Sequence, residues 1–226
     1  MGRDSEEDVL RSLASALEAV NKLFKAVVLS RAAYSYLCWL IPVSITVIIS
    51  SIKPLVGTVY ETIILACIWA TSIPVILLQF HKASRALEAY ARAFRAQGSE
   101  ECSGRVTSRL IAIGWACAWI VYPLITILLS LPPLSMPKQI IAPLSLIITL
   151  SIGVSFTGVW ELVCFNCKIS LIAASILYAT IVMLLLAPTT NYWDIAVGGL
   201  FLSYTTAAVL YIHEGLKLVA PREGEG

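Results

Sequence analysis

Six apolar runs, each about as long as a membrane-crossing helix, constrain the fold of this chain more than any other feature. They span residues 32–52, 58–80, 109–131, 139–160, 169–187 and 194–213. An α-helix needs about 20 residues to cross ~30 Å of hydrocarbon. Because lipid offers the backbone no hydrogen-bond partners, such runs predict helices and not strands. We therefore expect an all-α fold, a polytopic membrane helical bundle with six transmembrane helices.

The composition agrees with a lipid environment. Only 13% of the 226 residues are charged and 58% are hydrophobic, whereas a soluble domain carries about 25% charged and about 45–50% apolar residues. The charge is too sparse to cover a surface that faces water, so the lipid bilayer is the first expected partner. Prolines inside four of the runs are compatible with kinked membrane helices. They are Pro42, Pro74, Pro123 and Pro143.

The basic residues predict the orientation of the chain. If both termini are cytoplasmic, all 16 Lys and Arg residues except Lys53 and Lys138 fall on the inner side of the membrane. Cytoplasmic segments carry such an excess of basic residues. The predicted localisation is therefore the cell membrane, with several crossings and both termini in the cytoplasm.

Short outer links group the six runs as three hairpins. The links "KPLVG", "PPLSMPK" and "APTTNYW" each contain proline, which suits a tight reversal between helices. Aromatic residues at the ends of the runs are typical of the belts that mark membrane surfaces. They are Tyr192 and Trp193 on the outer side, and Trp160 and Tyr211 on the inner side.

A short amphipathic stretch occurs twice on the inner side. It reads "ALEAVNKLFKA" at 16–26 and "ALEAYARAFRA" at 86–96. In the first copy apolar residues recur three and four positions apart, the spacing of a heptad seam. We predict two cytoplasmic amphipathic helices and an internal repeat, in which each copy precedes a membrane hairpin. No residue breaks the chain between Val27 and Ala32, so the first helix is free to run into the first span.

These predictions divide the chain into consecutive segments. The inner helices and links cover 1–31 (first amphipathic helix), 81–108 (second amphipathic helix and loop), 161–168 (short link) and 214–226 (tail). The three hairpins cover 32–80, 109–160 and 169–213.

An exposed apolar seam outside the membrane marks a surface for a protein partner. The predicted partner-binding residues are Leu13, Leu17, Val20 and Phe24 in the first helix, and Leu87, Tyr90 and Phe94 in the second. The partner is another copy of the chain, giving a homo-oligomer, or another membrane or cytosolic protein. Two alternatives stay open: the two helices pack on each other, or they lie flat on the membrane with their basic faces outward.

Ionisable residues inside a span are functional candidates by default, because burying charge in lipid is costly. Glu61 lies slightly inside the outer end of the second run and is the candidate for a transport path. Glu161, Asp194 and Glu214 lie at the edges of runs, where a carboxylate needs little explanation. The sequence predicts no buried chain of Asp, Glu, His and Lys, which argues against proton-coupled transport.

The inner side also holds weak candidates for a metal site. A lone CxxC, Cys164–Cys167, is weak evidence for redox or metal chemistry. Cysteine and histidine are the ligands that zinc prefers. The candidate ligands are His81, Cys102, Cys164, Cys167 and His213. The alternative is that reduced cysteines and interfacial histidines lie there without a metal, and no cofactor is predicted.

Small and hydroxylated residues four positions apart predict close helix packing, or alternatively a polar lining for a small-molecule path. Such residues are Thr149, Gly153 and Thr157 in the fourth run, and Gly199 and Ser203 in the sixth.

No catalytic motif appears, whether GxSxG, HExxH or a P-loop, and nothing in the chain is typical of nucleic-acid binding. The leading hypothesis is a non-enzymatic membrane scaffold or complex subunit that acts through its cytoplasmic amphipathic helices. The alternative is a transport permease coupled to a cytosolic partner. A weaker alternative is a metal or redox membrane enzyme that uses the CxxC.

Overall fold

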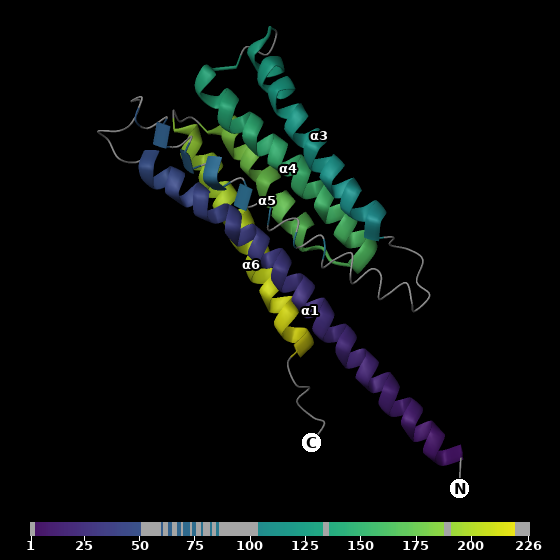
Figure 1. Cartoon of the computed structure of the whole chain (residues 1–226). Helices are drawn as coiled ribbons and strands as arrows, with labels where there is room; N and C mark the ends of the chain where they lie inside the picture. Colours follow the sequence, from purple (N-terminus) through teal and green to yellow (C-terminus); the bar gives the residue numbers. More distant parts are fainter. Residues whose placement is uncertain are drawn as a thin grey trace.

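The computed structural model describes residues 3–50, 104–132, 136–187 and 191–219, together with isolated positions between 60 and 85. Its helices are α1 (Arg3–Ser50), α3 (Gly104–Ser130), α4 (Lys138–Phe165), α5 (Ile169–Leu186) and α6 (Tyr192–Val219), shown in Figure 1. Each of these five is long and apolar enough to cross a membrane. The predicted all-α class is confirmed for this part of the chain, and its five long apolar helices are compatible with a membrane protein. Most of the second run, 58–80, lies outside the described residues, so the sixth span stays a prediction.

The helices follow the apolar runs closely. Predicted runs 109–131, 139–160, 169–187 and 194–213 correspond to α3, α4, α5 and α6. Pro42, Pro123 and Pro143 lie inside α1, α3 and α4, so none of them ends its helix. The helix α4 continues to Phe165 and ends at Asn166, which adopts a left-handed conformation with φ 51°. The amide of Asn166 then donates to Leu162 O at 3.1 Å, which closes the last turn.

The first amphipathic helix and the first span form one helix without interruption. At 48 residues, α1 is about 72 Å long, more than twice the ~30 Å of a hydrocarbon core. Its N-terminal half therefore extends past the end of the neighbouring helices, as Figure 1 shows. The start of α1 and the end of α6 lie at the same end of the molecule (Figure 1).

The described helices form two packed groups. Helix α1 packs along α6, while α4 packs against α3 and α5. Contacts of α6 with α4 and α5 join the two groups. The core is apolar and includes Leu144, Ile147, Leu177 and Leu184, each at most 2% exposed.

Close packing occurs where the small residues predicted it. A Cβ added to Gly153 of α4 would lie 2.6 Å from a ring carbon of Trp115 on α3. A Cβ at Gly199 of α6 would overlap the side chain of Thr180 on α5. Both are closer than real Cβ contacts, so the prediction of tight helix packing is confirmed at these glycines.

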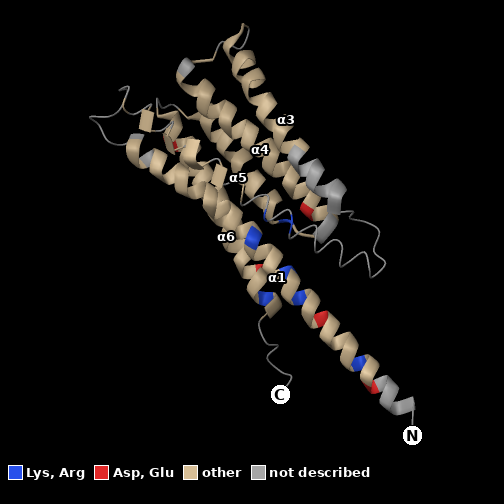
Figure 2. Cartoon of the chain, viewed as in Figure 1, with Lys and Arg blue, Asp and Glu red and all other residues tan. Residues whose placement is uncertain are grey.

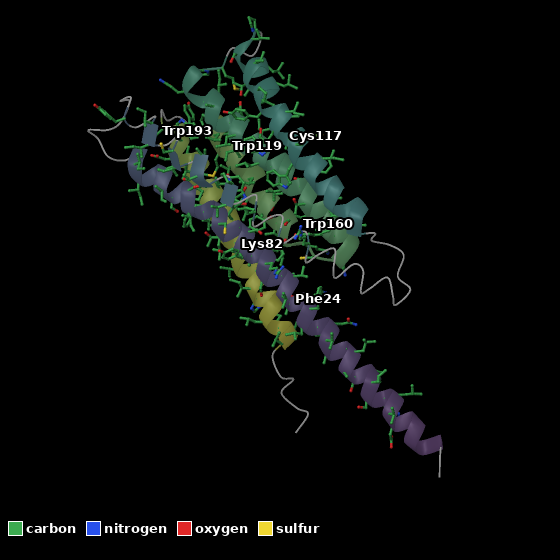
Figure 3. The ribbon with its side chains drawn as sticks, in the orientation of Figure 1. Phe24, Lys82, Cys117, Trp119, Trp160 and Trp193 are labelled. Carbon is green, nitrogen blue, oxygen red and sulfur yellow. The ribbon has the colours of Figure 1, made fainter. Side chains whose placement is uncertain are left out.

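Most of the charged residues in the described part of the chain gather at one end of the molecule. Figure 2 shows Lys, Arg, Asp and Glu along the N-terminal half of α1 and at the C-terminal end of α6. Along α1, Lys22 pairs with Glu18 at 2.6 Å, and along α6 Lys217 pairs with Glu214 at 2.9 Å. Trp193 and Trp160 lie towards opposite ends of the bundle in Figure 3, as expected for aromatic belts.

Candidate functional site

The first candidate site is the apolar seam on the N-terminal half of α1. Leu13, Leu17 and Val20 are 66%, 50% and 60% exposed. Phe24, labelled in Figure 3 near the middle of α1, is partly buried. The seam thus carries large apolar side chains that the described helices leave uncovered. The other predicted partner-binding residues, Leu87, Tyr90 and Phe94, lie outside the described residues.

This seam does not continue the face by which α1 packs on α6. The packed face is marked by buried Ala26, Leu29, Ala33, Leu40 and Val43. At about 100° per residue, that face and the seam through Leu10, Leu13, Leu17 and Val20 point about 160° apart around the helix axis. The seam therefore faces away from α6, and longer contact with α6 could not cover it.

The side chains beside the seam carry no charge. With Leu10 and Leu17 at position a of the heptad, the flanking g and e positions hold Val9, Ala16 and Leu23, and Ala14, Asn21 and Val28. The charged residues Arg11, Glu18, Lys22 and Lys25 occupy positions away from it. Charges at e and g positions select partners in coiled coils. Two identical copies of this seam can therefore meet without repulsion between like charges.

The second candidate site is a buried polar cluster near the C-terminal end of α4, centred on Glu161. This carboxylate is 7% exposed and accepts a hydrogen bond from the hydroxyl of Tyr211 on α6. The hydroxyls of Tyr211 and Ser170 lie 2.8 Å apart, as do those of Ser170 and Tyr36. Glu161, Ser170, Tyr211 and Tyr36 come from α4, α5, α6 and α1, so the cluster joins four helices.

The direction of this hydrogen-bond chain follows from its protons. A hydroxyl has one proton to donate, and Tyr211 donates its own to Glu161. The proton between Tyr211 and Ser170 must then come from Ser170, and the proton between Ser170 and Tyr36 must come from Tyr36. All three hydrogen bonds are therefore directed towards the carboxylate.

Aromatic contacts hold Tyr36, the member of the hydrogen-bond chain farthest from Glu161, in place. The Tyr36 ring stacks on Tyr211, with centroids 5.8 Å apart, and meets the edge of Tyr204 at 5.2 Å. Tyr204 and Tyr211 are 2% and 1% exposed. Because these rings come from α1 and α6, the cluster links that helix pair to α4 and α5.

One interpretation of the sequence was wrong at this cluster and another was incomplete. Glu161 lies near the end of its span, as expected, but its carboxylate is buried, because α4 continues to Phe165. Tyr211 is buried between helices and does not belong to an interfacial belt. The edge interpretation holds for Asp194 and Glu214, which are exposed and contact Asn191 and Lys217 respectively. The apolar runs gave no signal for the cluster, since its four members come from separate helices.

The metal candidates remain untested. His81 and Cys102 lie outside the described residues, and so does the side chain of Cys164. Cys167 is partly buried in the link between α4 and α5, and His213 is exposed on α6. Among the described residues no three His, Cys, Asp or Glu side chains are close enough to hold a metal ion. Glu61, the transport-path candidate, also lies outside the described residues.

Comparison with known proteins adds no assignment: no protein-family model, curated protein or solved structure matches this chain.

Proposed function

We propose that this protein is a non-enzymatic membrane scaffold that assembles with copies of itself through the N-terminal half of α1. The observation that carries the proposal is the exposed apolar seam facing away from α6. An exposed apolar surface of this extent is typical of an interaction site. Its heptad spacing suits a helix of the same kind.

The membrane favours a second copy as the partner. Copies inserted with the same orientation present their α1 helices in parallel, because each seam is continuous with a membrane span. Confinement to one membrane also raises the effective concentration of the two seams. The uncharged residues beside the seam let identical helices approach closely.

The proposal includes a topology. We propose that 58–80 forms a sixth span that completes the first of three hairpins, with both termini and both amphipathic helices in the cytoplasm of a cell-membrane protein. The shared end of α1 and α6 (Figure 1) and the charges gathered there (Figure 2) support this orientation.

A transport permease is the second candidate function. It is favoured by the buried Glu161 carboxylate, since ionisable groups inside a bundle commonly mark ion and proton pathways.

Replacing Leu17 by aspartate is expected to weaken self-association at least about tenfold, the effect of ~1.4 kcal/mol. Leu17 lies in the middle of the seam and is 50% exposed. Pairing would bury the new carboxylate without a partner, which costs about 1–3 kcal/mol. Native mass spectrometry in a mild detergent measures the ratio of assembled to single chains.

Ser15→Asp is the matched control, because Ser15 is exposed on the face of α1 opposite the seam. It adds the same charge within two residues and should leave assembly unchanged. If the unmodified protein is already a single chain in these spectra, self-assembly is refuted. Equal loss of assembly in both variants would show that charge, and not the seam, controls association.

Cys167 gives a test of the orientation. Burial raises the pKa of its thiol, and the thiolate is the reactive form. In a variant lacking the other five of the six cysteines, a membrane-impermeant thiosulfonate reagent should modify Cys167 in inside-out vesicles only. Because the pKa is raised, the rate should climb about tenfold per pH unit and still rise above pH ~8.5, the ordinary pKa of a free thiol. Modification of right-side-out vesicles would reverse the proposed topology.

A further inference from the structure

The buried carboxylate of Glu161 is compensated by hydroxyl groups. It accepts from Tyr211, and among the described residues no ion pair with a Lys, Arg or His side chain is found for it. A buried carboxylate without a cation is costly in its ionised form.

We infer that Glu161 is a proton-binding site, and that its protonation reverses the hydrogen-bond chain through Tyr211 and Ser170 to Tyr36. This inference does not depend on self-assembly through α1. It assigns the proton as ligand and places the consequence of binding on a different helix from the binding site.

The chemistry of the cluster favours a proton over a metal ion. Its donors are one carboxylate and three neutral hydroxyls, all engaged with one another. Calcium takes six to eight oxygen ligands, and zinc prefers nitrogen and sulfur. A proton needs only one carboxylate oxygen and a neighbour that can accept a hydrogen bond.

Counting protons gives the effect of protonation. In the ionised state three hydroxyl protons fill three hydrogen bonds, all directed towards Glu161. Uptake of one proton from water converts the carboxylate to a carboxylic acid and adds a fourth donor to the chain. When Glu161 donates to Tyr211, Tyr211 turns to Ser170 and Ser170 turns to Tyr36. The O–H groups rotate, no covalent bond breaks, and the proton of Tyr36 is left to point out of the chain.

Each helix or link packed around the cluster contributes polar, titratable or charged groups to its surroundings. Tyr36 comes from α1, and Tyr204 and Tyr211 come from α6. The Cys167 thiol of the link between α4 and α5 interacts electrostatically with Glu161, and also with Lys25 of α1 and Glu214 of α6. The α5 helix contributes Ser170 and is preceded by exposed Lys168.

The proton has a short route to water. Glu161 lies one and a half helical turns, about 7 Å along the axis, before Asn166. Asn166 and Lys168 are exposed at the end of the molecule that carries most of the described charges. Exchange with the inner aqueous phase therefore needs to cross only the last turn of α4.

Infrared difference spectroscopy tests the binding step. The purified full-length protein, in a detergent without carbonyl groups, is compared between about pH 3 and about pH 9, so that a carboxyl group titrating between these values changes its protonation state. We expect a carboxylic-acid carbonyl band at low pH that disappears in Glu161→Gln. In Tyr211→Phe the band should persist at higher frequency, because the protonated carboxyl group loses the hydrogen bond that its O–H donates to Tyr211. Glu214→Gln is the matched control and should leave this band in place, since Glu214 is exposed and paired with Lys217.

The reversal of the hydrogen-bond chain, here called the relay, is tested in the same spectra. Protonation of Glu161 should alter the phenol bands of isotope-labelled Tyr36, and Tyr36→Phe identifies those bands by removing them. Ser170→Ala should keep the carbonyl band but abolish the Tyr36 change, because Ser170 is the only hydroxyl joining Tyr36 to Tyr211 in the described chain. An unchanged carbonyl band in Glu161→Gln would overturn the proton site. A Tyr36 change that survives in Ser170→Ala would overturn the relay.

Discussion

Gly199→Leu is expected to destabilise the bundle strongly. Even a Cβ at this position would overlap the side chain of Thr180 on α5, so the larger leucine must separate α5 from α6. Overpacking of this kind costs about 1–3 kcal/mol and sometimes more. Thermal unfolding followed by intrinsic fluorescence in detergent should show a large fall in the midpoint temperature.

The neighbouring glycine supplies a matched control. A Cβ at Gly198 would meet no atom within 4 Å, and this residue is exposed. Gly198→Leu changes the same atoms one position away and should leave the midpoint nearly unchanged or raise it slightly, because leucine favours helix over glycine. Equal losses for the two variants would mean that α5 and α6 do not pack at Gly199 as described.

Tyr211→Ala is the second exchange with a large expected effect. It removes a ring that is 1% exposed, and truncation of a buried aromatic side chain costs about 3–5 kcal/mol. It also deprives the buried Glu161 of its hydroxyl donor, which adds about 1–3 kcal/mol. The same unfolding measurement should report a loss larger than that of Gly199→Leu.

Two further variants separate the ring from the hydroxyl. Tyr211→Phe keeps the packing and should lose only the smaller, hydrogen-bonding part. Tyr178→Ala removes a tyrosine that is 47% exposed, with a longer hydroxyl contact of 3.2 Å to Ser155, and should have little effect. If Tyr211→Ala unfolds at the temperature of Tyr178→Ala, the cluster does not hold the helices together.

The helices could be predicted from the sequence because membrane spans depend on length and apolarity. Both quantities are local, and α3 to α6 begin and end within a few residues of the predicted runs. The end of α4 was harder to place. Glu161 interrupts the apolar pattern, but the helix continues to Asn166, where the left-handed turn ends it. A polar residue ends an apolar run without ending a helix.

The seam could be predicted as a pattern, but not its direction. The heptad spacing of Leu10, Leu13 and Leu17 is visible in the chain. The orientation of the seam relative to α6 follows from Ala26, Leu29 and Ala33, which are buried on the opposite face of α1. The angle between the two faces depends on the tertiary structure, because it requires knowing which face of α1 contacts α6.

The Glu161 cluster could not be predicted, because its residues meet only after four helices have packed. Tyr204 and Tyr211 are seven positions apart and thus share one face of α6, with Ala207 and Ala208 between them. That pattern of large and small residues was a signal for a buried face. Nothing in it indicates that Ser170 and Glu161 lie opposite.

The unbroken course of α1 makes its projecting half a lever arm. From Val27 to Arg3 the arm is about 36 Å long, and α1 is helical throughout this stretch. A tilt of only about 10° at Tyr36, which contacts α5 and α6 and lies about 50 Å from the tip, would move the tip by about 9 Å. Small rearrangements at the Glu161 cluster are in this way magnified at the N-terminal tip of α1.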